Sequence, residues 1–284
     1  MAYTVSEFFR KSIRLLEDHG VFEPTTSAER IFSHHTGLSR TELYAAAETI
    51  IYSPLIHNIK AALERRINGE PVAYIIGECE FYNIKLKIDK RVMIPRPETE
   101  ILVDECIKLL RVKEGNLHIA DIGAGSGNIA ISLAVNLPDA DLIAIDTEHS
   151  ALELAKENAR LNNVADRIDF TRGDLLKPLE YFRHKFDAIV SNPPYISWDD
   201  RDSLPVEVRK YEPEKALFCR EDGLYIIRNL AEQAVEYLNA GGFLALEIGH
   251  NQGDEAKNIM RNHFNSVKLI KDYSGNDRIV IGIT

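Results

Sequence analysis

His118-Ile-Ala-Asp-Ile-Gly-Ala-Gly-Ser-Gly-Asn-Ile-Ala130 is an apolar stretch that runs into a glycine-rich loop and then into a second apolar stretch. This order predicts a buried strand, a tight loop and the start of a helix. Glycines tolerate positive φ angles and let a ligand approach the backbone closely. We therefore expect this segment to begin an α/β domain and to form a binding loop.

From residue 117 onward, apolar stretches of strand length alternate with longer stretches of helical periodicity. The expected strands are 117–122, 142–146, 167–171, 186–191, 242–247, 267–272 and 278–283. The expected helices between them are 127–136, 149–162, 223–239 and 252–264. This alternation is typical of crossover units on a mainly parallel sheet with helices on both faces. A turn signal at 272–278 predicts an antiparallel last strand.

The spacing of the glycines in this loop indicates which kind of nucleotide cofactor it would bind. Gly123, Gly125 and Gly127 form a G-x-G-x-G pattern, whereas the dinucleotide fingerprint requires its third glycine one residue later, where this chain has Asn128. Asp146 ends the next expected strand, where a carboxylate accepts hydrogen bonds from both hydroxyls of a ribose. Together these features favour a nucleoside cofactor without a pyrophosphate, namely S-adenosylmethionine.

Other interpretations of the first loop stay open. The glycines alone are also compatible with a tight turn that binds no ligand, and Asp146 with a cap on the helix that follows it. After the third strand, Gly173-Asp174-Leu175 could close over an adenine ring, with Leu175 packed against it.

A second loop, Asn192-Pro-Pro-Tyr195, follows the expected fourth strand at the edge where α/β sheets bind ligands. A proline-stiffened turn would explain Pro193 and Pro194, but not the flanking Asn192 and Tyr195. Methylation of a planar NH2 group explains all four. The Asn192 side-chain oxygen and the Pro193 carbonyl would accept the two hydrogens of the nitrogen, orient its lone pair and offset the positive charge that develops. Tyr195 would stack on the planar group or enclose it.

Composition restricts the other possibilities. The chain has 284 residues, a net charge of −10 and 45% hydrophobic residues, values of a globular protein without the basic surface that nucleic-acid binding usually needs. Cys79, Cys106 and Cys219 form no pair motif and are expected to be buried, reduced thiols. We expect neither a signal peptide nor a membrane span nor a metal site, and a cytoplasmic location.

The sequence predicts three regions. Residues 1–72 have helical periodicity and nearly balanced charge, with eight Lys and Arg against nine Asp and Glu over residues 1–70. This helical unit would either dock a substrate or stabilise the fold. Residues 73–96 are expected to form a β-hairpin linker, because Glu80–Tyr82 and the alternating 84–88 flank Asn83. Residues 97–284 would form the catalytic domain, beginning with a helix after Pro97.

Beyond these two loops, several motifs extend along almost the whole chain. They are Gly69-Glu-Pro-Val-Ala-Tyr-Ile-Ile-Gly77, Glu80-Phe-Tyr82, Ile94-Pro-Arg-Pro-Glu-Thr-Glu100, Asp121-Ile-Gly-Ala-Gly-Ser-Gly127, Ser191-Asn-Pro-Pro-Tyr-Ile196, Tyr211-Glu-Pro213, Asp222-Gly-Leu224, Glu247-Ile-Gly249 and 272–278. In these motifs the sequence resembles the HemK/PrmC family, the protein-(glutamine-N5) methyltransferases of peptide chain release factors. Amino-methyltransferases of adenine and guanine share the Asn-Pro-Pro-Tyr loop alone, whereas the 94–100 segment and the N-terminal helices are particular to this family.

The resemblance implies a Rossmann-like class I methyltransferase fold, with a seven-stranded, mainly parallel sheet whose last strand is antiparallel. It also implies that the acceptor is the glutamine of the Gly-Gly-Gln motif in class 1 release factors and that the helical domain helps to hold the factor. The residues implied for the cofactor are Gly123, Ala124, Gly125, Ser126, Gly127, Asp146, Leu175 and Asn192. Those implied for the glutamine are Asn192, Pro193, Pro194 and Tyr195, with Asn192, Pro193 and Tyr195 as catalytic residues.

Two rival functions come from other classes. A nucleic-acid amino-methyltransferase would share the catalytic loop but would need a basic, aromatic-rich recognition region. A non-catalytic binding protein that kept the fold would bind the cofactor without transferring its methyl group. The intact Asp146, glycines and Asn192–Tyr195 loop argue against the second rival.

Overall fold

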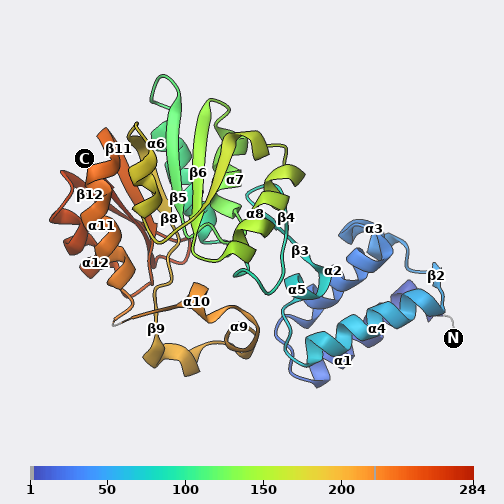
Figure 1. Ribbon diagram of the computed structural model, residues 1–284. Coiled ribbons are helices and arrows are strands. Elements are labelled where there is room, and N and C mark those ends of the chain that lie inside the picture. Colours follow the sequence, from blue (N-terminus) through green and yellow to red (C-terminus); the bar gives the residue numbers. More distant parts are fainter. Residues whose placement is uncertain (1–2, 221) are drawn as a thin grey trace. The chain divides into compact units, whose positions relative to one another are not determined.

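The computed structural model describes residues 3–220 and 222–284 (Figure 1). They divide into two compact units. The first comprises the chain up to Glu78 together with Pro205–Tyr211, and the second comprises Cys79–Leu204 and Glu212–Thr284. The sequence predicted a helical first region, but it did not predict that a segment from beyond residue 200 would join it.

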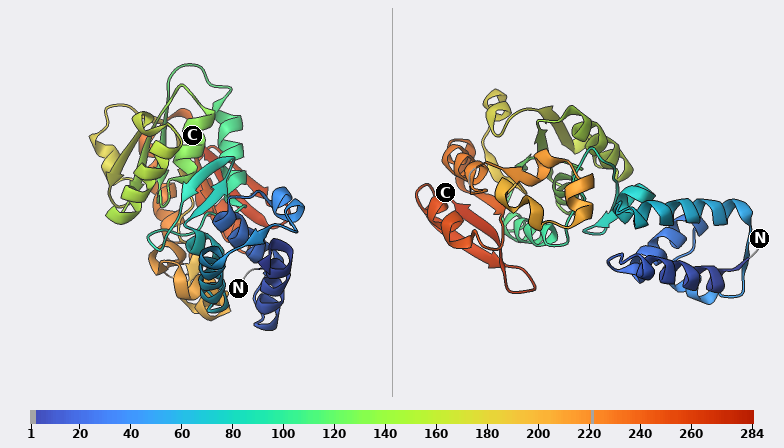
Figure 2. Two further views of the ribbon diagram at one scale, coloured as in Figure 1. Left: turned by 90° about the vertical axis from the view of Figure 1, so that its right-hand side faces the viewer. Right: turned by 90° about the horizontal axis from the view of Figure 1, so that it is seen from below.

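The first unit is built from helices with clear start signals. Its elements are β1 (Tyr3–Thr4), α1 (Val5–Asp18), α2 (Pro24–Thr36), α3 (Arg40–Ala45), β2 (Ile50–Ile51), α4 (Ser53–Ile67), α5 (Val72–Ile76) and α9 (Val206–Tyr211). Thr4 and Ser39 begin α1 and α3 with reciprocal side-chain and backbone hydrogen bonds to Glu7 and Glu42. Helices α1, α2 and α4 lie side by side around a buried aromatic and aliphatic core (Figure 2).

Buried Arg66 of α4 holds the segment Pro205–Tyr211 against the N-terminal helices of the first unit. Its guanidinium donates to the Glu207 carboxylate at 2.5 Å, to Ser27 Oγ at 3.2 Å and to the Glu70 carbonyl at 3.2 Å. The Tyr211 hydroxyl donates to the Asn68 carbonyl at 3.0 Å. A buried guanidinium needs several hydrogen-bond acceptors. Glu207 supplies a charged acceptor for Arg66 in addition to the neutral oxygens of Ser27 and Glu70.

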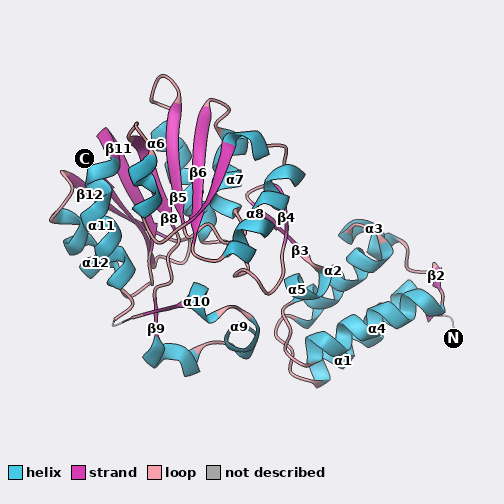
Figure 3. Ribbon diagram, viewed as in Figure 1, coloured by secondary structure: helices cyan, strands magenta, loops and turns pink. Residues whose placement is uncertain are grey.

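The second unit contains a seven-stranded sheet in the order β12-β13-β11-β8-β5-β6-β7 (Figure 3). Its strands are β5 (Leu117–Ile122), β6 (Ala140–Asp146), β7 (Ile168–Arg172), β8 (Phe186–Ser191), β11 (Leu238–Glu247), β12 (Ser266–Lys271) and β13 (Asp277–Ile283). Strand β13 runs antiparallel to both of its neighbours, and the other adjacent pairs are parallel. The predicted fold, including the antiparallel last strand, is confirmed.

Helices cover both faces of the sheet (Figure 3). They are α6 (Thr99–Leu110), α7 (Asn128–Asn136), α8 (His149–Leu161), α11 (Tyr225–Tyr237) and α12 (Gly253–Arg261). Successive strand side chains point to opposite faces. Ala120 and Ile122 pack in one cluster with residues of α11 and α12, whereas Asp121 accepts a hydrogen bond from the backbone of α7. Strand β5 is therefore buried on both sides, which explains its near-continuous apolar sequence.

Short elements complete the second unit. They are β3 (Glu78–Phe81), β4 (Ile84–Lys87), η1 (Ala165–Arg167), η2 (Lys177–Tyr181), β9 (Ile196–Ser197), η3 (Trp198–Ser203), α10 (Glu214–Leu217) and β10 (Phe218–Cys219). The β3–β4 pair lies within the predicted hairpin region, but Val72–Ile76 forms a helix and the strands end at Lys87. The three cysteines are buried, and none of them is in a disulfide bond.

Asn158 joins three parts of the second unit. Its Oδ1 accepts from the Lys87 N–H at 2.7 Å, and its Nδ2 donates to the carbonyls of Lys87 at 3.1 Å and Ser126 at 2.9 Å. The side chain is fully buried in α8. It therefore links the end of β4 to the glycine-rich loop.

We expect Asn158→Ala to lower the free energy of unfolding by about 2 kcal/mol, because it leaves backbone groups of Lys87 and Ser126 without partners. The measurement is urea denaturation followed by the fluorescence of Trp198, the single tryptophan, which lies in the same unit. Asn116→Ala removes an exposed amide, whose hydrogen bond to Asp141 lies at the surface, and should change stability by less than about 0.5 kcal/mol. Equal effects of the two substitutions would contradict this account.

Candidate active site

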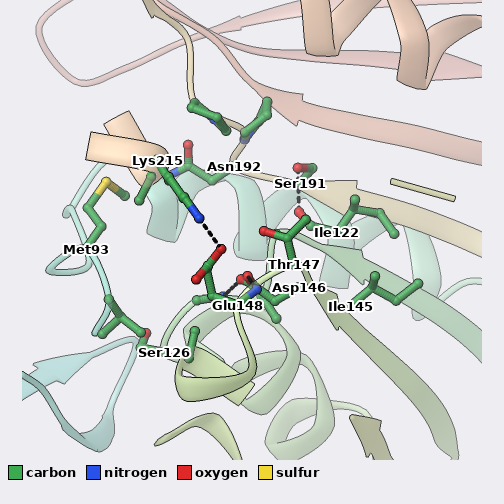
Figure 4. A pocket seen from close by; sticks show the side chains of 18 of the residues that line it. Met93, Ile122, Ser126, Ile145, Asp146, Thr147, Glu148, Ser191, Asn192 and Lys215 are labelled. Carbon is green, nitrogen blue, oxygen red and sulfur yellow. Dashed lines mark hydrogen bonds and ion pairs between the residues drawn. The ribbon is translucent and has the colours of Figure 1, made fainter. Parts of the chain in front are cut away.

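A cavity of about 210 Å³ lies in the second unit at the carboxyl ends of β5, β6 and β8. Figure 4 shows Met93, Asp146 and Asn192 among the side chains around it. Its lining includes the predicted site residues Gly123, Ala124, Gly125, Ser126, Asp146, Leu175, Asn192, Pro193 and Pro194. The fold thus brings together residues that are up to 71 positions apart in the sequence.

The glycine-rich loop leaves its backbone open on the cavity side. Gly123 and Gly125 adopt φ angles of 77° and 53°, which disfavour any residue with a Cβ. A Cβ on Gly123 would have no atom within 4 Å, so the space beside its backbone is empty. Gly127 has another function, because a Cβ there would lie 2.9 Å from Ile131 Cδ1 and 3.1 Å from Ala155 Cβ. It permits α7 and α8 to pack and is absent from the described cavity lining.

Asp146 shapes the same loop. One carboxylate oxygen accepts from the Gly125 N–H at 2.8 Å, and the other accepts from the Glu148 N–H at 2.9 Å (Figure 4). The capping interpretation from the sequence is wrong, because α8 begins after Glu148 and has no side-chain cap hydrogen bond. The bond from Glu148 to Asp146 instead holds the bend between β6 and α8. It does not exclude ribose binding, because each carboxylate oxygen has a second lone pair and Asp146 lines the cavity.

Leu175 reaches the cavity from the loop after β7 in a strained conformation. Its φ of 51° lies in the left-handed region, which a branched side chain rarely adopts. Such strain persists where the surrounding structure imposes it, and it gathers at binding sites. The position is that of an apolar wall for a flat ring.

Asn192 and Pro193 carry two hydrogen-bond acceptors at the end of β8. The Asn192 Nδ2 donates to Thr99 Oγ1 at 3.0 Å. Among the described residues, none donates to Asn192 Oδ1 or to the Pro193 carbonyl. Both residues line the cavity, so the pair is available to a ligand with two N–H groups on one nitrogen.

Two buried residues stand behind Asn192. Thr99 Oγ1 lies 2.6 Å from Glu247 Oε2, and both side chains are at most 1% exposed. Burial raises the pKa of Glu247 to about 7, although the Thr99 hydrogen bond and the Arg278 charge act in the opposite direction. No pattern in the sequence predicted a role in the site for either side chain. Their positions in the sequence could have indicated a role. Glu247 ends a strand as Asp146 does, and Thr99 begins the helix after Pro97.

Tyr195 has a different position from the one expected. Its hydroxyl lies 3.4 Å from Glu247 Oε1, and it is not among the described residues that line the cavity. Burial and the neighbouring Glu247 raise the pKa of its phenol. The Gln252 Nε2 donates to the Tyr195 carbonyl at 3.1 Å, and a Cβ on Gly223 would meet that carbonyl at 2.1 Å. The loop is thus held tightly at its Tyr195 end.

An ion pair lies at the rim of the cavity. Lys215 Nζ of α10 is 2.7 Å from Glu148 Oε1, next to Asp146 (Figure 4). The Lys215 side chain is 77% exposed, so the pair contributes little to stability. Among the described residues, no cluster of three or more His, Cys, Asp or Glu side chains is arranged to hold a metal ion.

The cavity suits S-adenosylmethionine. Bare glycine backbone, a carboxylate at a strand end and an apolar wall from Leu175 match the aminoacyl, ribose and adenine parts of that molecule. Residues 99–204 match the family model described as Methyltransferase small domain, and residues 7–77 match the PrmC N-terminal domain. A methyltransferase from Pyrococcus furiosus has a similar fold, with a TM-score of 0.50 and 20% identity over 80% of this chain and 98% of that one. The chain is an S-adenosylmethionine-dependent methyltransferase.

Curated relatives narrow this class. A release factor glutamine methyltransferase from Fusobacterium nucleatum is 40% identical over 97% of this chain and 77% of its own length. Another from Aliivibrio fischeri is 35% identical over 99% of this chain and 98% of its own length. The chain therefore belongs to the release factor glutamine methyltransferase family.

Asp146→Ala is expected to weaken cofactor binding at least tenfold, because it removes the ribose acceptor that we propose and frees the Gly125 N–H. Titration calorimetry with S-adenosylhomocysteine measures the effect. Asp169→Ala serves as the control, since this exposed carboxylate is on the adjacent strand and outside the described cavity lining. Unchanged affinity in the Asp146 variant would remove the ribose assignment.

Proposed function

We propose that the protein methylates the side-chain amide nitrogen of the glutamine in the Gly-Gly-Gln motif of class 1 release factors. The observation that carries this proposal is the pair of acceptors, Asn192 Oδ1 and the Pro193 carbonyl, beside a cavity suited to S-adenosylmethionine. Family membership supports the choice of acceptor, because the relatives are release factor glutamine methyltransferases.

The two acceptors address the main chemical obstacle. The lone pair of a carboxamide nitrogen is delocalised into its carbonyl, so the nitrogen is a poor nucleophile. Hydrogen bonds from both of its N–H groups to Asn192 and Pro193 fix the plane of the NH2 group and favour localisation of the lone pair. They also stabilise the positive charge that grows on the nitrogen as the new bond forms.

The cofactor, when bound, supplies an electrophilic methyl group on a sulfonium. Gly123, Gly125 and Asp146 would hold it, and Leu175 would pack on its adenine. Asn192 would contact both the cofactor and the acceptor amide. Pro193, followed by Pro194, keeps its carbonyl in one direction because both φ angles are restricted. The proton on nitrogen becomes far more acidic once the methyl group has been transferred, so these residues need not include a strong base.

The structure adjusts the predicted function of Tyr195. The partly buried Tyr195 phenol lies near Glu247 and supports the loop. The Tyr195 backbone, held by Gln252, directs the preceding residues. We therefore propose that Tyr195 contributes by enclosing the site and positioning Pro193 and Pro194. Direct stacking on the glutamine is not required by this arrangement.

The first unit is the proposed docking surface for the release factor. It exposes large apolar side chains, among them Phe22, Tyr52 and Val206. A location in the cytoplasm, where translation takes place, accompanies this proposal. No helix within residues 3–220 and 222–284 has both the length and the apolar character needed to cross a membrane. Methylation of an adenine or guanine amino group through the same loop is the alternative, which the net charge of −10 disfavours.

Asn192→Ala should reduce the rate of methyl transfer by about 100-fold to 1000-fold, because one of two stabilising contacts is lost. Affinity for S-adenosylhomocysteine should change far less. Single-turnover transfer to purified release factor gives the rate, and calorimetry gives the affinity. A variant with near-normal turnover would refute the assignment of Asn192.

The acceptor is tested by offering radiolabelled S-adenosylmethionine with four substrates. These are a class 1 release factor, its Gly-Gly-Ala variant, duplex DNA and ribosomal RNA. We expect label on the unmodified factor alone, since the other three lack the carboxamide at the required place. Label confined to nucleic acid would support the alternative function and exclude the proposed one.

A further inference from the structure

The Asn192 side chain presents two nearly isosteric faces, and only one of them suits the proposed acceptor. Its oxygen accepts hydrogen bonds, whereas its NH2 group only donates them. A glutamine NH2 group has only donors to offer through its hydrogens. If the Asn192 amide rotated by 180°, donors would face donors, and the contact that the mechanism requires would be lost.

The rotation of this amide is controlled by a buried chain of polar groups. Asn192 Nδ2 donates to Thr99 Oγ1 at 3.0 Å, and Thr99 Oγ1 donates to Glu247 Oε2 at 2.6 Å. The three residues come from the end of β8, the first turn of α6 and the end of β11. Only Asn192 and Thr99 line the cavity, so Glu247 acts from behind them.

The direction of these hydrogen bonds follows from which of the three side chains can donate a proton. An ionised carboxylate accepts and cannot donate, so the single proton of the Thr99 hydroxyl is directed to Glu247. The oxygen of Thr99 is then left with acceptor capacity alone. Only the NH2 face of Asn192 can satisfy it, and the oxygen face is turned toward the cavity.

We propose that Thr99 and Glu247 are positioning residues that lock the Asn192 amide with its oxygen toward the acceptor nitrogen. This inference rests on the proposed function, because it concerns the same amide. It assigns a role to two residues that never touch the transferred methyl group.

Protonation of Glu247 would reverse the direction of the hydrogen bonds that link Glu247, Thr99 and Asn192. A neutral carboxyl group can donate to Thr99, whose proton is then available to Asn192 Oδ1, and the amide can adopt the unproductive rotation. Glu247 is surrounded by Thr99, the Tyr195 hydroxyl, the positive charge of Arg278 and the negative charge of Glu98. Burial raises its pKa to about 7, so the lock is complete above that pH and weakens below it.

The first test removes the hydroxyl at constant volume. Thr99→Val should lower kcat for release factor methylation about tenfold to a hundredfold, whereas affinity for S-adenosylhomocysteine stays within about threefold. Thr99→Ser, which keeps the hydroxyl, should restore most of kcat. Ser132→Ala is the matched control, because its buried hydroxyl has no partner among the described residues. It should leave kcat unchanged.

Coupling to Asn192 separates positioning from a general loss of structure. In an Asn192→Ala background there is no amide to orient, so adding Thr99→Val should have no further effect on the rate. A purely structural role of Thr99 predicts instead that the two losses multiply. Multiplicative losses, or a Thr99→Val variant with normal kcat, would overturn the proposal.

A pH profile tests Glu247 directly. The kcat of the wild-type protein should fall as the pH drops through about 7, and Glu247→Gln should lose this acid limb because its amide does not titrate in this range. An unchanged acid limb in Glu247→Gln would contradict the role of Glu247. If the wild-type protein itself does not methylate the release factor, the proposed function fails, and this outcome is distinct from failure of the lock.

Discussion

Parallel strands end at the same edge of a sheet, and the site depends on this constraint. Strands β5, β6, β7 and β8 run in one direction, so the loops that follow them converge although they are far apart in the sequence. Strands β5, β6 and β8 are largely apolar and buried, whereas the chain at their carboxyl ends carries glycine, aspartate and asparagine. The buried strands therefore supply stability, and the loops that follow them supply the functional groups. The rigid sheet sets the distances between those groups.

Strand β11 pairs in parallel with β8, which brings a second carboxylate to the same edge of the sheet. Asp146 is partly exposed and orders the glycine-rich loop through backbone N–H groups. Glu247 is buried and interacts with side chains instead. Two acidic residues at equivalent strand ends thus acquire different functions because their surroundings differ. One organises the side of the site suited to the cofactor, and the other supports the amide on the acceptor side.

Several features of the site were predictable because they depend on local chemistry. The G-x-G-x-G loop, the carboxylate at the end of β6 and the Asn-Pro-Pro-Tyr loop are each defined by neighbouring residues in the sequence, and all three contribute residues to the cavity lining. The exceptions have physical reasons. Gly127 serves helix packing against Ala155, a contact between helices that local spacing does not reveal. Tyr195 turns its phenol toward Glu247, because the carboxylate of a distant strand and the tight contact with Gly223 determine its direction.

The sequence by itself determined the class of fold, the approximate positions of the seven strands of the main sheet and of the helices that cover it, and the type of chemistry. Hydrophobic periodicity and turn residues are properties of short segments, and they act before the chain is folded. Only the tertiary structure decided that Pro205–Tyr211 joins the first unit, where the buried Arg66 guanidinium needs the Glu207 carboxylate. It alone placed Thr99 beside Asn192, 93 residues away in the sequence, and Glu247 beside Thr99, 148 residues away. Hydrogen bonds between such distant residues form only when packing brings them together, so no local pattern encodes them.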